Sequence, residues 1–446
     1  MRFAEWADRI RHSLWFIPAL STVAAAVAAL LLVWLSSETD AEATQLPLLF
    51  SAGVDGARAM LQAIAGSIIT VAGVVFSITI VALQLTSTQF SPRVLRNFLR
   101  DRSTQFVLGA FMGTFTYSLL VLRSIRSEDE SAAAFVPSFA ITGALVLTLI
   151  SLGMLIYFIH HISVRIQVTS IVASVAADTL ETLERLGRRW ADDADRSWNP
   201  AADQTAPTVP PSGGIPITDA MASELLLPAH ESGYLQFVSI ETLVTAAREA
   251  HGRLRMLIAP GMWLQKGVPC AAFEPEGGRD IDRERLEEGL KKALGVGHER
   301  SMAEDPAFGI QQLVDIAIKA LSPSVNDPTT AMNCVDRLVQ ILIAAGTTSD
   351  APRAFSDADG APRLEVPFPS FDELCDLSFD QIRHYGRTAP AVVIHLARAL
   401  SVLRTLPQPR QPALGRHARL LADAAAALQS EEERRRAREA IAPLLP

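Results

Sequence analysis

Small and polar residues recur at helical spacing within an uncharged stretch of the sequence, residues 59–92. Intervals of three, four and seven place them on one helix face: Gly66, Thr70, Gly73, Ser77, Gln84 and Ser87. Such a face either lets helices pack closely or lines a narrow aqueous path, where side-chain oxygens replace part of an ion's hydration shell. Close packing is the commoner use of such a face, and we take these six residues as candidate pore-lining positions. The opposite face is apolar, with Ile64, Ile68, Val71, Val75 and Ile78.

Basic residues follow directly after this stretch. Ser91 and Pro92 predict a helix start, and Arg93, Arg96 and Arg100 then share a face at positions i, i+3 and i+7. Such a face suits an electropositive ring at a pore mouth or a contact with anionic lipid. The ordinary excess of arginine on the cytoplasmic side of a membrane is the commoner explanation.

A second polar motif, SPSVNDPTTAMNC, covers residues 322–334. Asp327 before Pro328 is typical of a helix N-cap, and Asn326 tolerates a turn. Together with Asp315 and Asn333, these residues could form a ligand or metal site in the cytoplasmic part. A helix–helix corner held by capping is the commoner structure for such a pattern.

The sequence offers little support for a metal site, an enzyme or a nucleic-acid-binding protein. Cys270, Cys334 and Cys375 lie far apart, and the Cys and His spacing indicates neither a disulfide framework nor a metal site. Phosphate-binding, nucleophile-elbow, metalloprotease and EF-hand motifs are missing, so we expect no enzyme and no cofactor. The net charge of −8 makes nucleic acid an unsuitable partner.

The polar face of residues 66–87 lies in one of four segments that contain no Asp, Glu, Lys or Arg. They are residues 13–37, 59–92, 103–122 and 131–159. A bilayer core of about 30 Å takes roughly 20 residues of helix, so each segment can span it. We place the spans at about 14–36, 60–88, 104–122 and 135–159. Because no charge lies inside any span, a passive channel or a simple anchor fits better than an ion-coupled transporter.

The direction of the spans follows from the charges at their ends. Eight Lys or Arg residues flank one side and three flank the other. The positive-inside rule therefore predicts a multi-pass protein of the bacterial inner membrane with both termini in the cytoplasm.

The rest of the chain predicts a cytoplasmic α+β domain after a membrane region of four helices, residues 1–163. Residues 164–190 predict a connecting helix, and 191–214, rich in Ala, Asp, Pro and Gly, predict a flexible linker. Short apolar runs with Pro-Gly and Lys-Gly turns predict a small β-barrel or sandwich over 215–275. Residues 276–446 predict a helical bundle, with 352–369 as a Pro-rich insertion.

Four motifs carry a resemblance to a known family. They are VFSITIVALQLTSTQFSPRVLRNFLRD (75–101), SGYLQFVSIETL (232–243), FGIQQLVDIAIKALSPSVNDPTTA (308–331) and FDQIRHYG (379–386). On these motifs the sequence resembles a bacterial family of predicted membrane proteins, domain of unknown function twenty-two fifty-four. The resemblance spans nearly the whole chain and implies four membrane helices before a soluble domain. It implies no activity and no catalytic residue.

These observations lead to two functional hypotheses. The first is a homo-oligomeric passive pore for small ions, with the lipid bilayer and further copies of the chain as partners and the cytoplasmic domain as vestibule or gate. The alternative is a non-conducting, membrane-anchored sensor or scaffold that binds a partner or small ligand through its cytoplasmic domain.

Overall fold

The computed structural model describes residues 15–43, 53–89, 102–127, 135–165, 167–192, 197–198, 224–276, 282–347 and 354–445. The chain divides into two compact units, Met1–Ser170 and Ile171–Pro446. Each unit has its own core and is described by itself.

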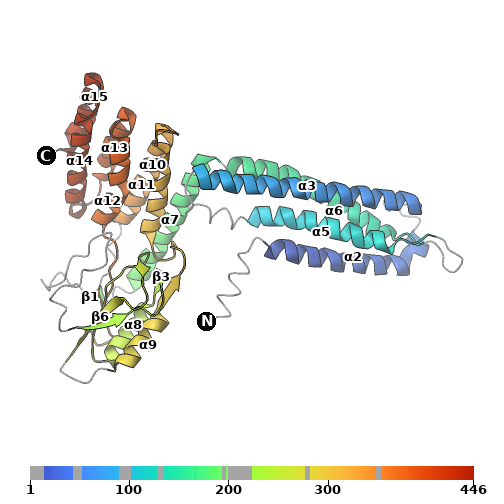
Figure 1. The fold of residues 1–446 in the computed structure, drawn as a ribbon, viewed down its shortest axis with the longest axis horizontal. Coiled ribbons are helices and arrows are strands. Elements are labelled where there is room, and N and C mark those ends of the chain that lie inside the picture. The colour runs from blue at the N-terminus through green and yellow to red at the C-terminus, as the bar shows by residue number, and fades with distance from the viewer. Residues whose placement is uncertain are drawn as a thin grey trace. The chain divides into compact units, whose positions relative to one another are not determined.

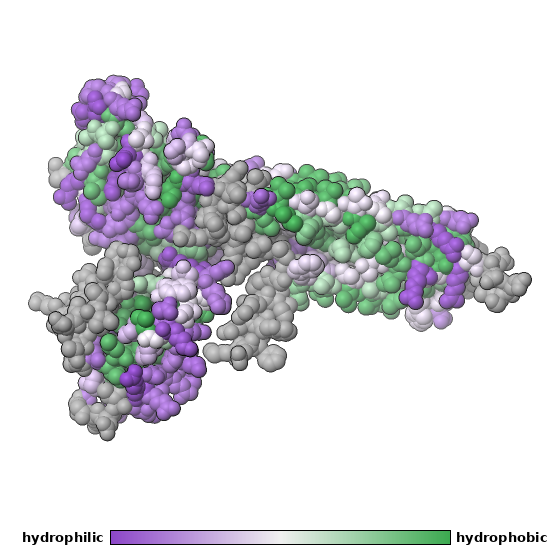
Figure 2. Space-filling view, viewed as in Figure 1, coloured by the Kyte–Doolittle hydropathy of each residue, from purple (hydrophilic) through white to green (hydrophobic). Residues whose placement is uncertain are grey.

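Long apolar helices make up the first unit: α2 (Phe16–Ala43), α3 (Val54–Gln89), α5 (Arg102–Ser124) and α6 (Ser138–Arg165) (Figure 1). In the described parts of the chain, four stretches are long and apolar enough to cross a membrane, namely Phe16–Glu38, Val54–Gln84, Arg102–Ser124 and Ser138–Val164. Most of the visible surface along this unit is hydrophobic, whereas the second unit presents mainly hydrophilic residues (Figure 2). The prediction of four apolar helices that could span a membrane is confirmed.

Helix α5 is the centre of the first unit and packs against α2, α3 and α6. Gly109 and Gly113 face Ser21 and Ala25 of α2 so closely that an added Cβ at Gly109 would lie 2.6 Å from the Ser21 hydroxyl. The Tyr117 hydroxyl donates to the Ala140 carbonyl of α6 at 2.8 Å. Small residues on one side and buried polar contacts on the other therefore hold α5 between its neighbours.

Polar and aromatic side chains fill the interior of this unit. The Thr114 and Ser151 hydroxyls hydrogen-bond at 2.9 Å between α5 and α6, and Phe111 and Phe158 are fully buried. The four helices thus pack around a solid core.

The second unit contains most of the long helix α7 (Val168–Asp192) and two sheets. The larger sheet has the order β1-β8-β9-β4-β6-β2, and β4 and β9 are its one parallel pair among the described strands. Its strands are β1 (Ser197–Trp198), β2 (Leu225–Pro228), β4 (Gly252–Met256), β6 (Pro269–Pro275), β8 (Ala354–Ser356) and β9 (Pro362–Glu365). The smaller sheet has the order β5-β3-β7, from β3 (Gly233–Val238), β5 (Trp263–Leu264) and β7 (Leu294–Gly297).

Strands β8 and β9 come from the segment that the sequence pattern presents as a Pro-rich insertion. They bury Phe355 and Leu364 in the same core as Leu254 and Phe273, and Leu254 of β4 pairs with Leu364 of β9. Helices α8 (Ile240–Glu249) and α9 (Arg283–Ala293) pack against each other, and α8 also contacts β4 and β9. The boundary expected at residue 275 therefore divides strands that belong to one sheet, while the barrel or sandwich arrangement stays a prediction.

Six longer helices complete the second unit: α10 (Pro306–Ala320), α11 (Pro328–Thr347), α12 (Phe371–Gly386), α13 (Pro390–Leu403), α14 (Gln411–Ala426) and α15 (Glu431–Ile441). Side-chain caps at Asp305 and Ser370 begin α10 and α12, and Glu373 completes a capping box with Ser370. Short 3-10 turns follow α13 and α15 at Gln408–Arg410 and Ala442–Leu444. A helical and mixed-sheet region after the apolar helices is therefore confirmed.

Candidate functional site

The small and polar face of α3 points away from the packed interior of its unit. Gly66, Thr70, Gly73, Ser77 and Gln84 are exposed, whereas Ile64, Ile68 and Val75 on the opposite face are buried. Among the described residues, a Cβ added at Gly66 or Gly73 would meet nothing within 4 Å. The structure thus brings these five residues together on one open helix face.

Two details of this face differ from the simple helical pattern. Ile78, expected among the inward residues, is 40% exposed, because it lies at the edge of the buried stripe. The Thr70 hydroxyl donates to the Gly66 carbonyl of its own helix at 2.8 Å, so it needs no partner outside α3. The backbone of Ser87 belongs to α3, but its side chain lies outside the described residues, as do Arg93, Arg96 and Arg100.

The polar motif of residues 322–334 is a helix corner. Asn326 has a left-handed backbone with φ of 47°. The Asp327 carboxylate accepts hydrogen bonds from the Thr330 amide at 3.1 Å and the Thr330 hydroxyl at 2.6 Å. These bonds hold the pKa of Asp327 below its usual range. The contacts of Asp327 are those of an N-cap on α11.

The other residues of this motif lie on the two helices beside the corner. Asp315 accepts a hydrogen bond from Gln311 within α10 at 2.8 Å, and Asn333 is half-buried on α11. Asp305, just before α10, is buried and pairs with the Arg300 guanidinium at 2.5 Å. Burial raises the pKa of Asp305, against the opposing effect of Arg300. Asp305 is thus the N-cap of α10, while Asp315 and Asn333 lie within helices rather than at their starts.

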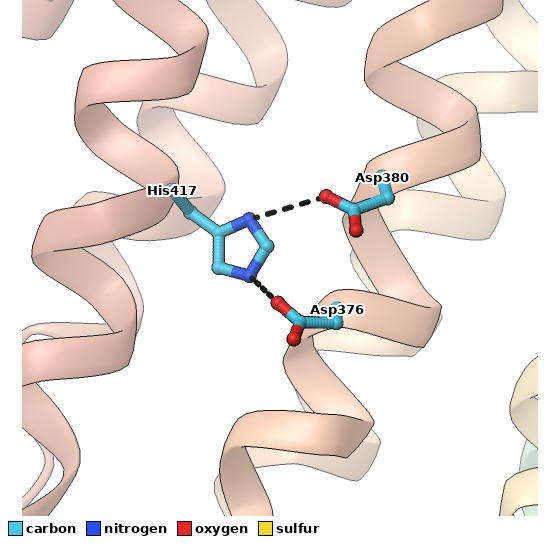
Figure 3. A group of neighbouring side chains, drawn as sticks. All are labelled: Asp376, Asp380 and His417. Carbon is cyan, nitrogen blue, oxygen red and sulfur yellow. Dashed lines mark ion pairs between the residues drawn. The ribbon is translucent and has the colours of Figure 1, made fainter. Parts of the chain in front are cut away.

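A further cluster joins helices α12 and α14. Asp376 and Asp380 lie one turn apart on α12, and the ring of His417 reaches between them from α14 (Figure 3). His417 Nε2 lies 3.0 Å from Asp376 Oδ1, and His417 Nδ1 lies 3.9 Å from Asp380 Oδ1. With one ligand atom from each residue, all three atoms lie within 4.8 Å of one another.

Two arginines and an aromatic ring surround this cluster. Arg416 contacts Asp376 at 2.7 Å, Arg383 contacts Asp380 at 3.0 Å, and the Phe379 and His417 rings pack in a T-shaped arrangement. His417 is only 2% exposed. Burial lowers the pKa of His417, although the two carboxylates act in the opposite direction. Burial of the ring therefore opposes its protonation, and the two carboxylates favour it.

Sequence reasoning missed this cluster. The Asp-x-x-x-Asp spacing in FDELCDLSFDQIRHYG puts both carboxylates on one helix face and was the available signal. His417 lies on a different helix, 41 residues after Asp376, so no helical or strand periodicity relates the two. Only the packing of α14 on α12 brings the three side chains together.

Comparison with known proteins links nearly all of the first unit and most of the second unit to one family. Residues 11–402 match the model of the family described as "Predicted membrane protein (DUF2254)". Uncharacterized proteins of Mycobacterium bovis and Mycobacterium tuberculosis are 34% identical over 364 residues, which are 80% of this chain. The aligned part is 65% of those relatives, so the chain spans about two thirds of their length. No solved structure matches the chain.

Proposed function

The chain belongs to the DUF2254 family of predicted membrane proteins of unknown function, and from this premise we propose that it forms a passive pore for small ions. The pore is built by several copies of the chain in a bacterial inner membrane. The soluble unit lies in the cytoplasm and serves as vestibule or gate. The proposal assigns no reaction to the chain.

The observation that carries this proposal is the open polar face of α3. A single copy leaves Gly66, Thr70, Gly73, Ser77 and Gln84 exposed, while the opposite face buries Ile64, Ile68 and Val75. In hydrocarbon, amide and hydroxyl groups are better placed against another helix or water than against lipid. Apposed α3 helices from several copies would place the Ser77 hydroxyl and the small residues Gly66 and Gly73 against another helix.

The filled core of the first unit supports a path between copies over a path through one copy. Phe111, Tyr117 and Phe158 are fully buried there, and the Thr114–Ser151 hydrogen bond joins α5 to α6. Gly66 and Gly73 lie two turns apart, about 10 Å along the helix at 1.5 Å per residue. Two such small positions on one face are typical of close helix contacts in membranes.

The absence of charge in the spans supports passive conduction. Residues 59–92 contain no Asp, Glu, Lys or Arg, whereas pumps and coupled transporters carry ionisable groups in the bilayer. Arg93 and Arg96 follow this stretch and would raise the anion concentration at the mouth, an effect screened over about 8 Å at physiological salt.

Flux through reconstituted liposomes tests the proposal. Ser77→Leu and Gln84→Leu should each reduce the flux of small ions, because leucine replaces an oxygen that faces the path. The matched control is Ser67→Leu, which makes the same change at another exposed position of α3, away from the polar face. Replacing both Arg93 and Arg96 by Glu should shift selectivity toward cations.

Cross-linking tests the oligomer separately from conduction. Gly73→Cys should form disulfide-linked dimers in native membranes, whereas Val75→Cys on the buried face should not. The native cysteines are buried, and burial raises the pKa of Cys270 and Cys334 to about 12, so they contribute little background. Cross-linked, folded protein that passes no ions under tension, voltage or pH steps would overturn the pore and leave the anchored sensor or scaffold.

A further inference from the structure

We propose that Asp376, Asp380 and His417 bind a divalent transition-metal ion of the zinc class between helices α12 and α14. The site is independent of the pore and lies wholly within the second unit. Two ligands come from one helix face, at i and i+4, and the third comes from the facing helix. This is how helical proteins build metal sites from side chains that project between helices.

The three ligand atoms must move closer together to bind a metal ion. The three ligand atoms lie within 4.8 Å of one another. Zinc–ligand bonds near 2.1 Å bring tetrahedral ligand atoms to about 3.4 Å apart. The Asp380 side chain is 47% exposed and can turn toward the ring. Because the two nitrogens of His417 face different carboxylates, the metal takes one nitrogen and Asp380 makes the larger movement.

His417 supplies the observation that points to a ligand. Among the described residues, the buried Nδ1 of His417 has no hydrogen-bond partner and lies 3.9 Å from Asp380 Oδ1, while Nε2 is 3.0 Å from Asp376 Oδ1 without the geometry of a hydrogen bond. Buried polar atoms in proteins are nearly always hydrogen-bonded, so an imidazole in this condition needs an explanation. A metal ion on one nitrogen, within reach of the carboxylates, provides it.

The ligand types and the neighbouring charges select the ion. Imidazole suits zinc and its transition-metal neighbours, while magnesium and calcium take oxygen ligands. Arg416 and Arg383 hold the two carboxylates, as outer-shell partners of metal ligands commonly do. Their positive charges also oppose a cation, so the site favours an ion that gains a bond to nitrogen over one attracted by charge alone.

Zinc titration of the purified, chelator-stripped full chain in detergent tests this proposal. We expect one tight equivalent per chain, measured by competition with a chromophoric chelator. Asp376→Asn, Asp380→Asn and His417→Gln should each weaken zinc binding at least tenfold. Millimolar magnesium should not compete.

Two controls keep the outcome clear. His384→Gln removes an exposed histidine of α12 outside the cluster and should leave zinc affinity unchanged. Asp380→Asn alters a half-exposed side chain and should fold normally, so it stands in for His417→Gln if that buried variant does not fold. Zinc should raise the thermal unfolding temperature of the wild type and not of Asp380→Asn.

Contrary results are equally defined. Equal zinc affinity in the wild type and in folded Asp380→Asn would overturn the site, and so would wild-type protein that binds no zinc at millimolar concentration. Neither result bears on ion flux, so the pore and the metal site stand or fall separately.

Discussion

Gly309 lies where helix α10 contacts α7, the helix that follows the last apolar helix in the chain. A Cβ atom added there would come within 1.9 Å of Thr179 Oγ1, and that hydroxyl already donates to the Val175 carbonyl at 2.6 Å. Gly309→Ala should therefore lower the free energy of unfolding by about 1–3 kcal/mol, the usual cost of overpacking a core. Urea denaturation followed by circular dichroism measures this difference.

A glycine without a close neighbour provides the matched control. Among the described residues, a Cβ at Gly415 of α14 would meet nothing within 4 Å, so Gly415→Ala should stabilise its helix by up to about 1 kcal/mol. Thr179→Ala combined with Gly309→Ala should recover part of the loss. A Gly309→Ala variant as stable as the wild type would show that α7 does not pack closely here.

Asp327 is expected to matter for stability at neutral pH. Asp327→Ala removes the N-cap of α11 and should cost about 0.5–2 kcal/mol. Hydrogen bonds from Thr330 lower the folded-state pKa of Asp327, and the unfolded value is about 3.9. The contribution is therefore complete above about pH 4 and is lost as pH falls through the lower folded value.

Urea midpoints measured from pH 7 to pH 2.5 check this dependence. The curves for the wild type and for Asp327→Ala should converge at the acidic end. A variant that keeps full stability at pH 7 but loses ion flux would mean that the loop is a functional site rather than a cap.

Strands β8 and β9 are integral parts of the larger sheet. Residues 354–368 bury Phe355, Leu364, Val366 and Phe368 in the hydrophobic core that the strands of the second unit share. Arg363 also pairs with the buried Asp357 at 2.7 Å and with Glu276 at 2.9 Å. Deleting residues 354–368 should consequently unfold the larger sheet and its core, although the composition of these residues suggests a dispensable insertion.

Limited proteolysis and circular dichroism of the deletion variant test this expectation. Deleting residues 201–214 is the control, because their composition predicts a linker that buries little apolar area. They lie outside the described residues. A stable, protease-resistant protein without residues 354–368 would show that the strands are an accessory of the sheet.

The whole molecule combines apolar helices with a separately packed unit, and its orientation follows from charge alone. Eight Lys or Arg residues against three predict cytoplasmic termini. Reporter fusions at Glu42 and Ser127 should therefore read as periplasmic, and a fusion after Pro446 as cytoplasmic. The opposite pattern would put the soluble unit outside the cell and remove the basis for a cytoplasmic gate.

Local patterns predict the parts of this fold that depend on neighbours in sequence. The apolar helices follow from length and composition, the open face of α3 from a period of 3.6 residues, and the cap at Asp327 from one Asp-Pro pair. The pairing of Leu254 with Leu364 joins strands far apart in the chain. The contact of Asp376 with His417 joins two helices in the same way. Such contacts have no local period, so the sequence pattern could not predict them.

The central place of α5 has a consequence for biosynthesis. Among the four candidate spans it has the lowest mean hydropathy and the largest buried share, and it carries Gln105, Thr114 and Ser118 at buried positions. The translocation machinery admits a segment to lipid according to its hydrophobicity, so α5 gains least from entering alone. Its Tyr117 bond to Ala140 also waits for α6, which is made later. We expect α5 to wait at the translocation channel until α6 has been made, and to enter the bilayer together with it.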